Sequence, residues 1–150
     1  MKYLLILFVV ALALAPLTHF LPSKRQRQIA RMREYAAVHG LFVEFRDLPA
    51  VARSSAPAER KQQVIYYGKR LPPSRGTPRE RRAWLAQDGE WQGLQRSWQA
   101  PAISAALPAA VLAAGVDEGS CGIYWREDGS EADVQQIVDA LMAWEQALCG

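Results

Sequence analysis

The residues best suited to covalent chemistry lie in 119–122 (GSCG), where small residues surround Cys121. A cysteine nucleophile needs a nearby base, and the chain offers only His19 and His39 for that role. His19 lies in an apolar run, and His39 ends a predicted helix. Because free cysteines are commonly buried as small hydrophobic residues, we expect Cys121 to pack in the core and Cys149 to be inert. A Cys121-dependent enzyme is the less favoured alternative.

Acidic residues gather near the start of the last predicted helix, where Asp128, Glu131 and Asp133 accompany Ser130. A calcium loop of the EF-hand type requires a fixed ligand spacing and a final glutamate, which this segment lacks. Helix capping explains the same residues. Two histidines and two cysteines, scattered as they are, do not form a zinc motif, and no glycine-rich phosphate-binding motif is present. We therefore predict no catalytic residue, no metal and no cofactor.

Tryptophan is abundant, with five in 150 residues. Tryptophan and arginine often dominate binding energy at protein interfaces, so an aromatic groove for a partner is one interpretation. The favoured interpretation is a core of large aromatic residues, because tryptophan is mostly buried on average. Four residues lie on or near predicted strands and are the candidate partner-binding aromatics: Trp84, Trp91, Trp98 and Trp125.

Residue periodicity indicates the elements that would position these side chains. Alternation of apolar residues predicts strands over 41–48, 63–68 and 119–127, with loops at 50–60 and 69–78. Asp88-Gly89 predicts a hairpin within 82–96, although a capping pattern at 77–80 leaves a helix open.

Helical spacing predicts a helix over 23–39 that Ser23 caps, and a last helix that begins after Ser130. The alanine-rich segment 101–114 is predicted to be mostly helical, with a break at Pro108. Together the elements predict an α+β fold: an N-terminal transmembrane helix plus a small domain with about five mostly antiparallel strands and two to three helices.

The transmembrane prediction depends on residues 3–21 (YLLILFVVALALAPLTHFL), which carry no acidic or lysine or arginine side chain. A membrane-spanning helix needs about 20 apolar residues and tolerates proline. We therefore predict a transmembrane anchor over 1–22, a juxtamembrane basic helix over 23–40 and a soluble α+β domain over 41–150.

Basic residues follow the apolar run closely, whereas the N-terminal side offers only Lys2 and the amino group. Positive charge next to a span is retained in the cytoplasm. The predicted localisation is therefore a bacterial inner membrane, crossed once, with the C-terminal domain in the cytoplasm. Five side chains are predicted to contact anionic headgroups of the membrane surface: Lys24, Arg25, Arg27, Arg31 and Arg33.

A cleaved signal peptide is the alternative interpretation of the same run. Ala13-Leu14-Ala15 and the overlapping Ala11-Leu12-Ala13 have the small-x-small form of a cleavage site. Pro16 directly after the first site, and the basic flank, argue against cleavage. This alternative would give a periplasmic-facing anchored or secreted binding domain.

Charge is distributed unevenly along the chain. Residues 24–96 carry 16 basic and 7 acidic side chains, whereas residues 97–150 carry one basic and 8 acidic ones. Anionic lipid attracts the first part and repels the second. Nucleic acid is the rival partner for the basic part, and we predict no nucleic acid because an anchored domain meets lipid phosphates first. Two cysteines in a cytoplasmic domain are expected to be free thiols.

The N-terminal arrangement resembles small single-pass inner-membrane proteins of proteobacteria, some of them YajC-like. The apolar run is followed by Leu21-Pro22-Ser23-Lys24-Arg25-Gln26. This stretch is similar to the Arg-Pro-Gln-Gln-Lys type of sequence that follows the span in the family of the accessory translocase subunit YajC. The similarity covers about the first 35 residues. It implies an accessory role at the inner membrane and assigns no functional residue.

One functional expectation follows from these features. The chain is predicted to be a membrane-anchored, non-enzymatic domain that faces the cytoplasm and acts as an accessory, protein-interaction module. Its partners would be anionic lipid headgroups and a membrane or cytoplasmic protein. The periplasmic-facing binding domain and the Cys121-dependent enzyme are the two alternatives.

Overall fold

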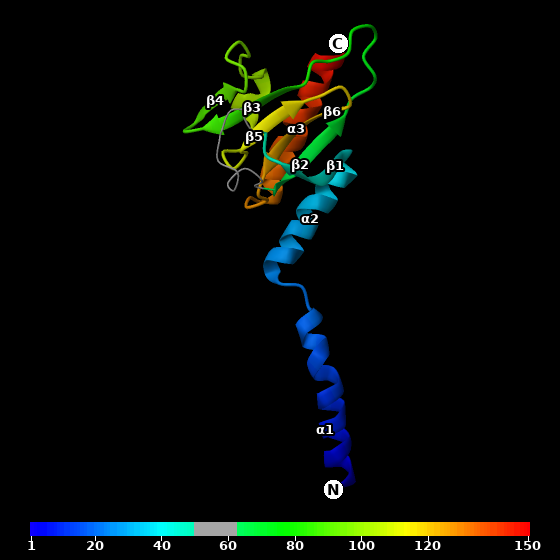
Figure 1. Ribbon diagram of the computed structural model, residues 1–150. Helices are drawn as coiled ribbons and strands as arrows, with labels where there is room; N and C mark the ends of the chain where they lie inside the picture. Colours follow the sequence, from blue (N-terminus) through cyan, green and yellow to red (C-terminus); the bar gives the residue numbers. More distant parts are fainter. Residues whose placement is uncertain (50–62) are drawn as a thin grey trace. The chain divides into compact units, whose positions relative to one another are not determined.

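The computed structural model describes residues 1–49 and 63–150 of the chain (Figure 1). The predicted loop at 50–60 lies outside the described residues. Two compact units are present, Met1–Ala30 and Arg31–Gly150. The second unit contains the sheet and is the unit that builds the candidate site.

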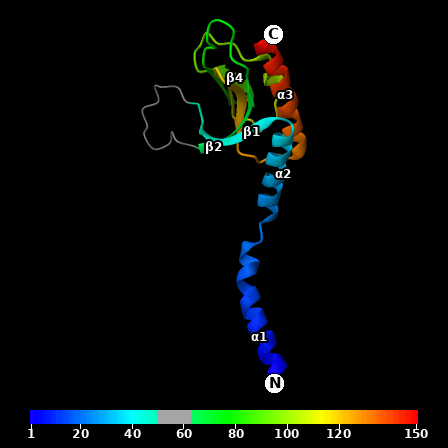
Figure 2. The same ribbon diagram turned by 90° about the vertical axis from the view of Figure 1, so that its right-hand side faces the viewer.

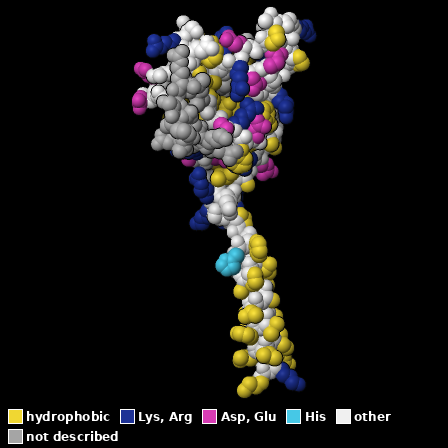
Figure 3. All heavy atoms as spheres, in the orientation of Figure 1, with side chains coloured by type: hydrophobic (Ala, Val, Ile, Leu, Met, Phe, Trp, Pro, Cys, Tyr) yellow, Lys and Arg dark blue, Asp and Glu magenta, His cyan; other side chains and the backbone are white. Residues whose placement is uncertain are grey.

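In the first unit, the helix α1 (Lys2–Leu14) passes into a 3₁₀ helix, η1 (Ala15–Phe20). Pro16 lies at the start of η1, where it removes a backbone donor and ends the regular α-helical pattern. The side chains of α1 are exposed and mostly hydrophobic, as the space-filling view in Figure 3 shows. At 1.5 Å per residue, the 13 residues of α1 extend about 20 Å, whereas the hydrocarbon core of a bilayer is about 30 Å thick.

This geometry corrects the prediction made from the apolar run. Among the residues that the structure describes, no helix combines the length and the apolar character that crossing a membrane requires. The finding contradicts the predicted transmembrane helix, and with it the single-pass topology and the inner-membrane localisation. The run of 19 uncharged residues suggested one long helix because membrane-spanning helices tolerate proline, whereas here the α-helix ends at Leu14 and Pro16 lies in a 3₁₀ helix.

The helix α2 (Lys24–Val38) begins with a capping box, as the sequence predicted at Ser23. The Ser23 amide donates to the Gln26 side chain at 2.9 Å, and the Gln26 amide donates to the Ser23 hydroxyl at 3.2 Å. After α2, Gly40 adopts φ of 81°, the left-handed conformation that favours glycine at a helix end. This glycine reverses the chain directly into the first strand.

Six strands in the described residues form one sheet, and every pairing is antiparallel. The order across the sheet is β1-β2-β6-β5-β3-β4 (Figure 1). The sequence predicted about five strands, whereas the described residues form six. The transmembrane helix predicted beside them is contradicted by the helix lengths given above. The strands are β1 (Leu41–Asp47), β2 (Gln63–Arg70), β3 (Arg82–Gln87), β4 (Glu90–Gly93), β5 (Ala113–Val116) and β6 (Ser120–Trp125).

The missed strand is β5, which lies in the alanine-rich segment predicted to be helical. Only the short 3₁₀ helix η2 (Ala102–Ala106) forms there before β5 begins. The four residues of β5 are all buried, between β6 and β3. Small side chains suit this central position, so tertiary packing overrides the helical preference of alanine.

The predicted hairpin is confirmed. The strands β3 and β4 are joined by Asp88 and Gly89, which both have positive φ, 51° and 81°. Such a turn matches the twist of the flanking strands. Ala86 pairs with Trp91, and Trp84 pairs with Gly93, so the two tryptophans are diagonal neighbours on one face.

One face of the sheet is covered by α3 (Glu131–Cys149), which packs on β6 and β2 and contacts η2 (Figure 2). Ser130 and Asp133 form the capping box at its start. The core between α3 and the sheet includes Trp125 and Ile137, which are fully buried. The rings of Trp84 and Trp144 lie 5.9 Å apart in the same layer.

The last turns of α2 are held to this core by a buried carboxylate. Arg33 donates two hydrogen bonds of 2.7 Å to Glu127, and the Tyr67 hydroxyl donates a third at 2.8 Å. Met32 and Ala36, one turn apart on α2, are fully buried. These contacts fix where β1 starts, and β1 carries Arg46 toward the opposite face of the sheet.

Candidate functional site

The face of the sheet opposite α3 carries a second, aromatic cluster. Tyr66 and Tyr124 are paired across β2 and β6, and their rings lie 4.9 Å apart. The ring of Phe42 lies 5.7 Å from that of Tyr66. A Cβ atom on Gly122 would come within 2.4 Å of the Tyr66 ring. The glycine therefore leaves the space in which Tyr66 lies flat on the sheet.

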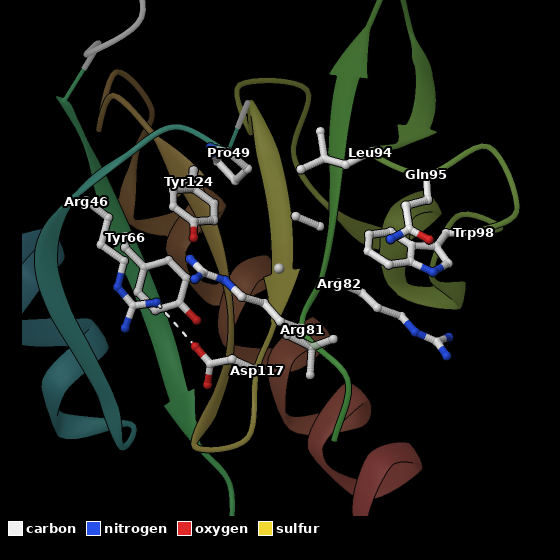
Figure 4. A pocket seen from close by; sticks show the side chains of 13 residues that line it. Arg46, Pro49, Tyr66, Arg81, Arg82, Leu94, Gln95, Trp98, Asp117 and Tyr124 are labelled. Carbon is white, nitrogen blue, oxygen red and sulfur yellow. Dashed lines mark ion pairs between the residues drawn. The ribbon is translucent and has the colours of Figure 1, made fainter. Parts of the chain in front are cut away.

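A pocket of about 440 Å³ opens beside this cluster (Figure 4). It lies within the second unit and is lined from β1, β2, β3, β5 and β6 and from the segment after β4. Small residues of β3 and β5, among them Ala83 and Gly115, leave room at its wall. Figure 4 shows Arg46, Tyr66 and Tyr124 at one end of the pocket, and Leu94, Gln95 and Trp98 with Arg82 at the other. Arg81 and Asp117 also line it.

Arg46 is the most strongly positioned cation of the pocket. Its guanidinium carbon lies 3.8 Å from the centre of the Tyr66 ring, which is a close cation–π distance. The Arg46 Nε donates to Glu44, two residues earlier on β1. The Arg46 Nη1 lies 3.7 Å from the Asp117 Oδ2. Stacking and the two carboxylates hold the guanidinium plane in one orientation above the sheet.

Asp117 is held in place by the turn that joins β5 to β6. Its carboxylate accepts hydrogen bonds from the amides of Gly119 and Ser120, at 2.9 and 2.8 Å. The Ser120 hydroxyl lies 3.1 Å from the hydroxyl of Tyr66. Burial raises the pKa of Tyr66 above its usual value, so this phenol is protonated and can donate a hydrogen bond.

Arg81 and Arg82 bring further positive charge to the pocket from the start of β3. Arg82 is paired with Glu80 at 3.0 Å, and its guanidinium carbon lies 6.0 Å from the Trp98 ring centre. Within the described part of the chain, Arg81 makes no hydrogen bond or ion pair. Figure 4 shows its guanidinium pointing toward the Tyr124 hydroxyl. Burial raises the pKa of Tyr124, which the nearby positive charges of Arg46 and Arg81 oppose.

The loop before β3 is tied to the same turn that carries Asp117. The Glu118 carboxylate accepts a 2.7 Å hydrogen bond from the Ser74 hydroxyl, and it also accepts hydrogen bonds from the backbone amides of Ser74 and Arg79. These hydrogen bonds hold the pKa of Glu118 below its usual value of 4.5. Arg79 donates in return to the carbonyl of Glu118 at 3.0 Å. The loop therefore delivers Arg81 to the pocket from an anchored position.

The predicted aromatic residues do not form one binding surface. Trp125 is fully buried, and Trp84 is 5% exposed with its Nε1 donating to the Gln99 carbonyl at 2.8 Å. Trp91 is half-buried and lines a separate groove between the β3–β4 turn and the segment before β5. Only Trp98 lines the pocket. The core interpretation thus holds for Trp84 and Trp125, and Trp98 is the one that the structure places at a candidate site.

The predicted membrane-surface residues are also not equivalent. Lys24, Arg25, Arg27 and Arg31 are exposed on α2. Arg33 is committed to the internal pair with Glu127. Contact of these side chains with anionic headgroups stays a prediction, and Arg33 has a structural role in addition.

The two thiols are free, and they differ in exposure. Cys121 is fully buried on the α3 side of β6, and burial raises its thiol pKa to about 12. Cys149 is exposed near the end of α3. A thiolate nucleophile needs a lowered pKa and access to substrate. The burial of Cys121 and its raised pKa both disfavour that role.

The main residues of the pocket were not identified from the sequence, although a signal was present. Alternation along 41–48 put Arg46 on one face with Phe42, and alternation along 119–127 separated Tyr124 from Trp125. The pattern does not show which strands are neighbours in the sheet, and here β1 and β6 both pair with β2. Arg81 lies in a loop-to-strand transition, where no periodicity marks which way a side chain points.

No protein-family model matches this sequence, and neither a curated protein nor a solved structure shows detectable similarity to it. The function must therefore be argued from the chemistry of the pocket itself.

Proposed function

We propose that this protein is a non-enzymatic binding module that takes up an acidic segment of a partner protein in the pocket on the face of its sheet opposite α3. The observation that carries the proposal is the composition of the pocket. Three arginines, Arg46, Arg81 and Arg82, meet one carboxylate, Asp117, beside aromatic and apolar walls. Arginine with aromatic residues is the combination that most often supplies binding energy at protein interfaces.

One arginine of the pocket has no carboxylate partner among the described residues, and this supports an anionic partner. Arg82 is neutralised in part by Glu80, and Glu44 and Asp117 offset the charge of Arg46. Arg81 adds a cation that no described carboxylate pairs. Complementary charge steers association and sets register, so a partner segment with acidic residues fits this arrangement better than a neutral one.

The aromatic geometry favours protein over single-stranded nucleic acid. Proteins that bind single strands stack bases on exposed aromatic rings. Here Tyr66 and Tyr124 are 1% and 5% exposed, and Arg46 already lies over the Tyr66 ring. Only the half-buried Trp98 offers part of a ring face. The pocket also spans about 440 Å³, within the range of about 300 to 1,000 Å³ typical of compact ligand sites.

A random peptide library displayed on phage and selected on the full chain tests the proposal. The expected result is enrichment of peptides that carry acidic residues, and loss of this enrichment on the double variant Arg46→Gln, Arg81→Gln. A matched variant, Arg75→Gln, changes an exposed arginine outside the pocket and is expected to select the same peptides as the wild type.

Enrichment that the double variant retains would contradict the proposal, because the peptides would then bind elsewhere. A folded double variant is confirmed by an unchanged near-ultraviolet circular dichroism spectrum. In the same assay format, a labelled single-stranded oligonucleotide is expected to bind no more tightly to the wild type than to the double variant. Tight binding of the oligonucleotide that depends on the pocket would favour nucleic acid instead.

A further inference from the structure

We propose that the cationic end of the pocket is a subsite for one carboxylate group, and that the apolar end accepts the side chain of an adjacent apolar residue. The inference rests on the proposed function and gives it a chemical specificity. The carboxylate would lie between the guanidinium groups of Arg46 and Arg81, within reach of the Tyr66 and Tyr124 hydroxyls. The recognised motif would thus be an acidic residue next to a large apolar one.

Arg46 has donors that its internal partners do not use fully. Its Nε is engaged by Glu44, and its guanidinium is also a hydrogen-bond partner of the Tyr124 side chain. The distance of 3.7 Å from Nη1 to the Asp117 Oδ2 is too long for a hydrogen bond. The guanidinium is at the same time fixed by stacking on Tyr66 at 3.8 Å. A planar donor group held in advance loses little entropy on binding, and it suits the two oxygens of a carboxylate.

Arg81 supplies the second side of the subsite. Its guanidinium extends across the pocket toward the Tyr124 hydroxyl and lies opposite that of Arg46 in Figure 4. Among the described residues, no side chain forms a hydrogen bond or ion pair with the Arg81 guanidinium. An anion placed between Arg46 and Arg81 would therefore gain two charge-assisted contacts without breaking an existing one at Arg81.

Asp117 determines which anion the subsite prefers. Its carboxylate is fixed by the amides of Gly119 and Ser120 and lies at the edge of the subsite. A fixed negative charge disfavours a phosphate group, which carries close to two negative charges at neutral pH, more than it disfavours a carboxylate with one. We therefore assign the subsite to a carboxylate rather than a phosphate.

The other end of the pocket is suited to an apolar side chain. Leu94 and Trp98 are both half-buried there, and Ala83 lies beside them on β3. Figure 4 shows Leu94 and Trp98 on the side of the pocket away from Arg46 and Tyr66. The two ends are joined in one cavity, so the two groups of the partner must be close together in its chain.

Calorimetric titration of the full chain with short peptides tests the subsite. The reference probe is N-acetyl-Gly-Glu-Leu-Gly-amide, and the matched probes replace Glu by Gln, Glu by phosphoserine, or Leu by Gly. Replacing Glu by Gln or Leu by Gly is expected to weaken binding about tenfold or more, since a charge-assisted contact or a buried leucine is worth about 1.5 to 3 kcal/mol. The phosphoserine probe is expected to bind more weakly than the reference probe, because Asp117 repels the doubly charged phosphate. Sodium acetate is included to measure the carboxylate alone, which is expected to compete with the reference probe at high concentration.

Variants of the protein connect the probes to the named residues. Arg81→Ala is expected to reduce the preference for Glu over Gln about tenfold, because one charge-assisted contact is lost, while Arg75→Ala leaves it unchanged. Arg46→Lys keeps the charge but loses the planar fork, so it is expected to reduce the preference. Tyr124→Phe is expected to reduce it about tenfold, because a hydrogen bond from a phenol to a carboxylate is charge-assisted.

Two results would overturn the inference: equal affinity for the Glu and Gln probes, or a Glu preference that Arg81→Ala leaves unchanged. Tighter binding of the phosphoserine probe would reassign the subsite to a phosphate. These outcomes are separable from failure of the proposed function. Pocket-dependent selection of peptides without carboxylates would preserve the function and remove the subsite, whereas acetate binding at the pocket without any peptide binding would preserve the subsite and remove the function.

Discussion

Glu127 carries a carboxylate into the interior of the domain, where it is 3% exposed and adopts φ of 55°. The left-handed backbone conformation is uncommon for a residue other than glycine. Arg33 and Tyr67 supply three hydrogen bonds to this carboxylate, all of 2.7 to 2.8 Å. The Glu127 charge is therefore tolerated only because α2 brings Arg33 to it.

Arg33→Ala is expected to lower the free energy of unfolding by about 3 kcal/mol. Removing one partner of a buried ion pair costs about 3 to 5 kcal/mol, and the partial exposure of Arg33 favours the lower end. Arg31→Ala, two residues earlier and exposed, is the matched control and should change stability by less than about 0.5 kcal/mol. Urea unfolding measures both, and equal effects of the two variants would show that the pair does not hold α2.

The two cysteines are expected to differ in reactivity. In the native protein at pH 8, a colorimetric thiol reagent should titrate Cys149 rapidly and leave Cys121 unreacted, because the Cys121 thiol is buried with a pKa raised to about 12. Both thiols should react after denaturation. A Cys149→Ser variant should show almost no fast reaction, and rapid labelling of this variant would restore Cys121 as a candidate nucleophile.

At the scale of the elements, the glycine on β6 decides whether the aromatic cluster can form. Gly122→Ala is expected to destabilise the domain by about 1 to 3 kcal/mol, because the new methyl group overlaps the Tyr66 ring and the Tyr67 carbonyl. Gly119→Ala, in the exposed turn before β6, is the control with no such overlap. Equal stability of the two variants in urea would mean that Tyr66 does not lie against β6.

The loop before β3 should show a pH-dependent anchor. The pKa of Glu118 is lowered by its hydrogen bonds, so its stabilising contribution is present above the usual pKa of 4.5 and is lost as pH falls through the lowered value. Glu118→Gln should therefore be less stable than the wild type at pH 7, and the gap should be smaller at pH 3, which lies below the unfolded-state pKa. Urea unfolding at both pH values measures the gap, and a gap that does not change with pH would contradict this role.

Sequence patterns predicted the elements well where local rules decide them. The caps at Ser23 and Ser130, the Asp88-Gly89 turn and the alternation in β1 and β6 all follow from short-range chemistry. The pattern failed at 101–114, because burial of small residues in the sheet centre outweighs their helical preference. It also failed at the N-terminal run, where Pro16 begins a different helix type.

The candidate site was less predictable than the fold, for a physical reason. Arg46 and Asp117 are 71 positions apart and come together only because β2 pairs with β1 on one side and with β6 on the other. Periodicity gives the face on which a side chain lies, and it does not give the neighbour of each strand. The abundance of tryptophan was the stronger signal in the sequence, but three of the four candidates lie away from the pocket.

At the scale of the whole molecule, charge should control binding. The chain carries a net charge of +3, and the pocket adds local positive charge through Arg46, Arg81 and Arg82. The Debye length falls from about 10 Å at 0.1 M salt to about 3 Å at 1 M. Affinity for the Glu-containing probe should therefore fall with added salt, while the weaker affinity for the Gln-containing probe changes little. Equal salt dependence of the two probes would indicate binding outside the cationic pocket.

The most direct test of the central claim is a nuclear magnetic resonance titration of the isotopically labelled full chain with N-acetyl-Gly-Glu-Leu-Gly-amide. The predicted result is a saturable change of amide signals concentrated at the pocket, at Arg46, Arg81, Asp117 and Tyr124 and in 94–98. Signals of α3 and of the exposed α1 should stay unchanged. Changes centred on α3 or on residues 2–30, or no saturable change at any concentration, would contradict the account.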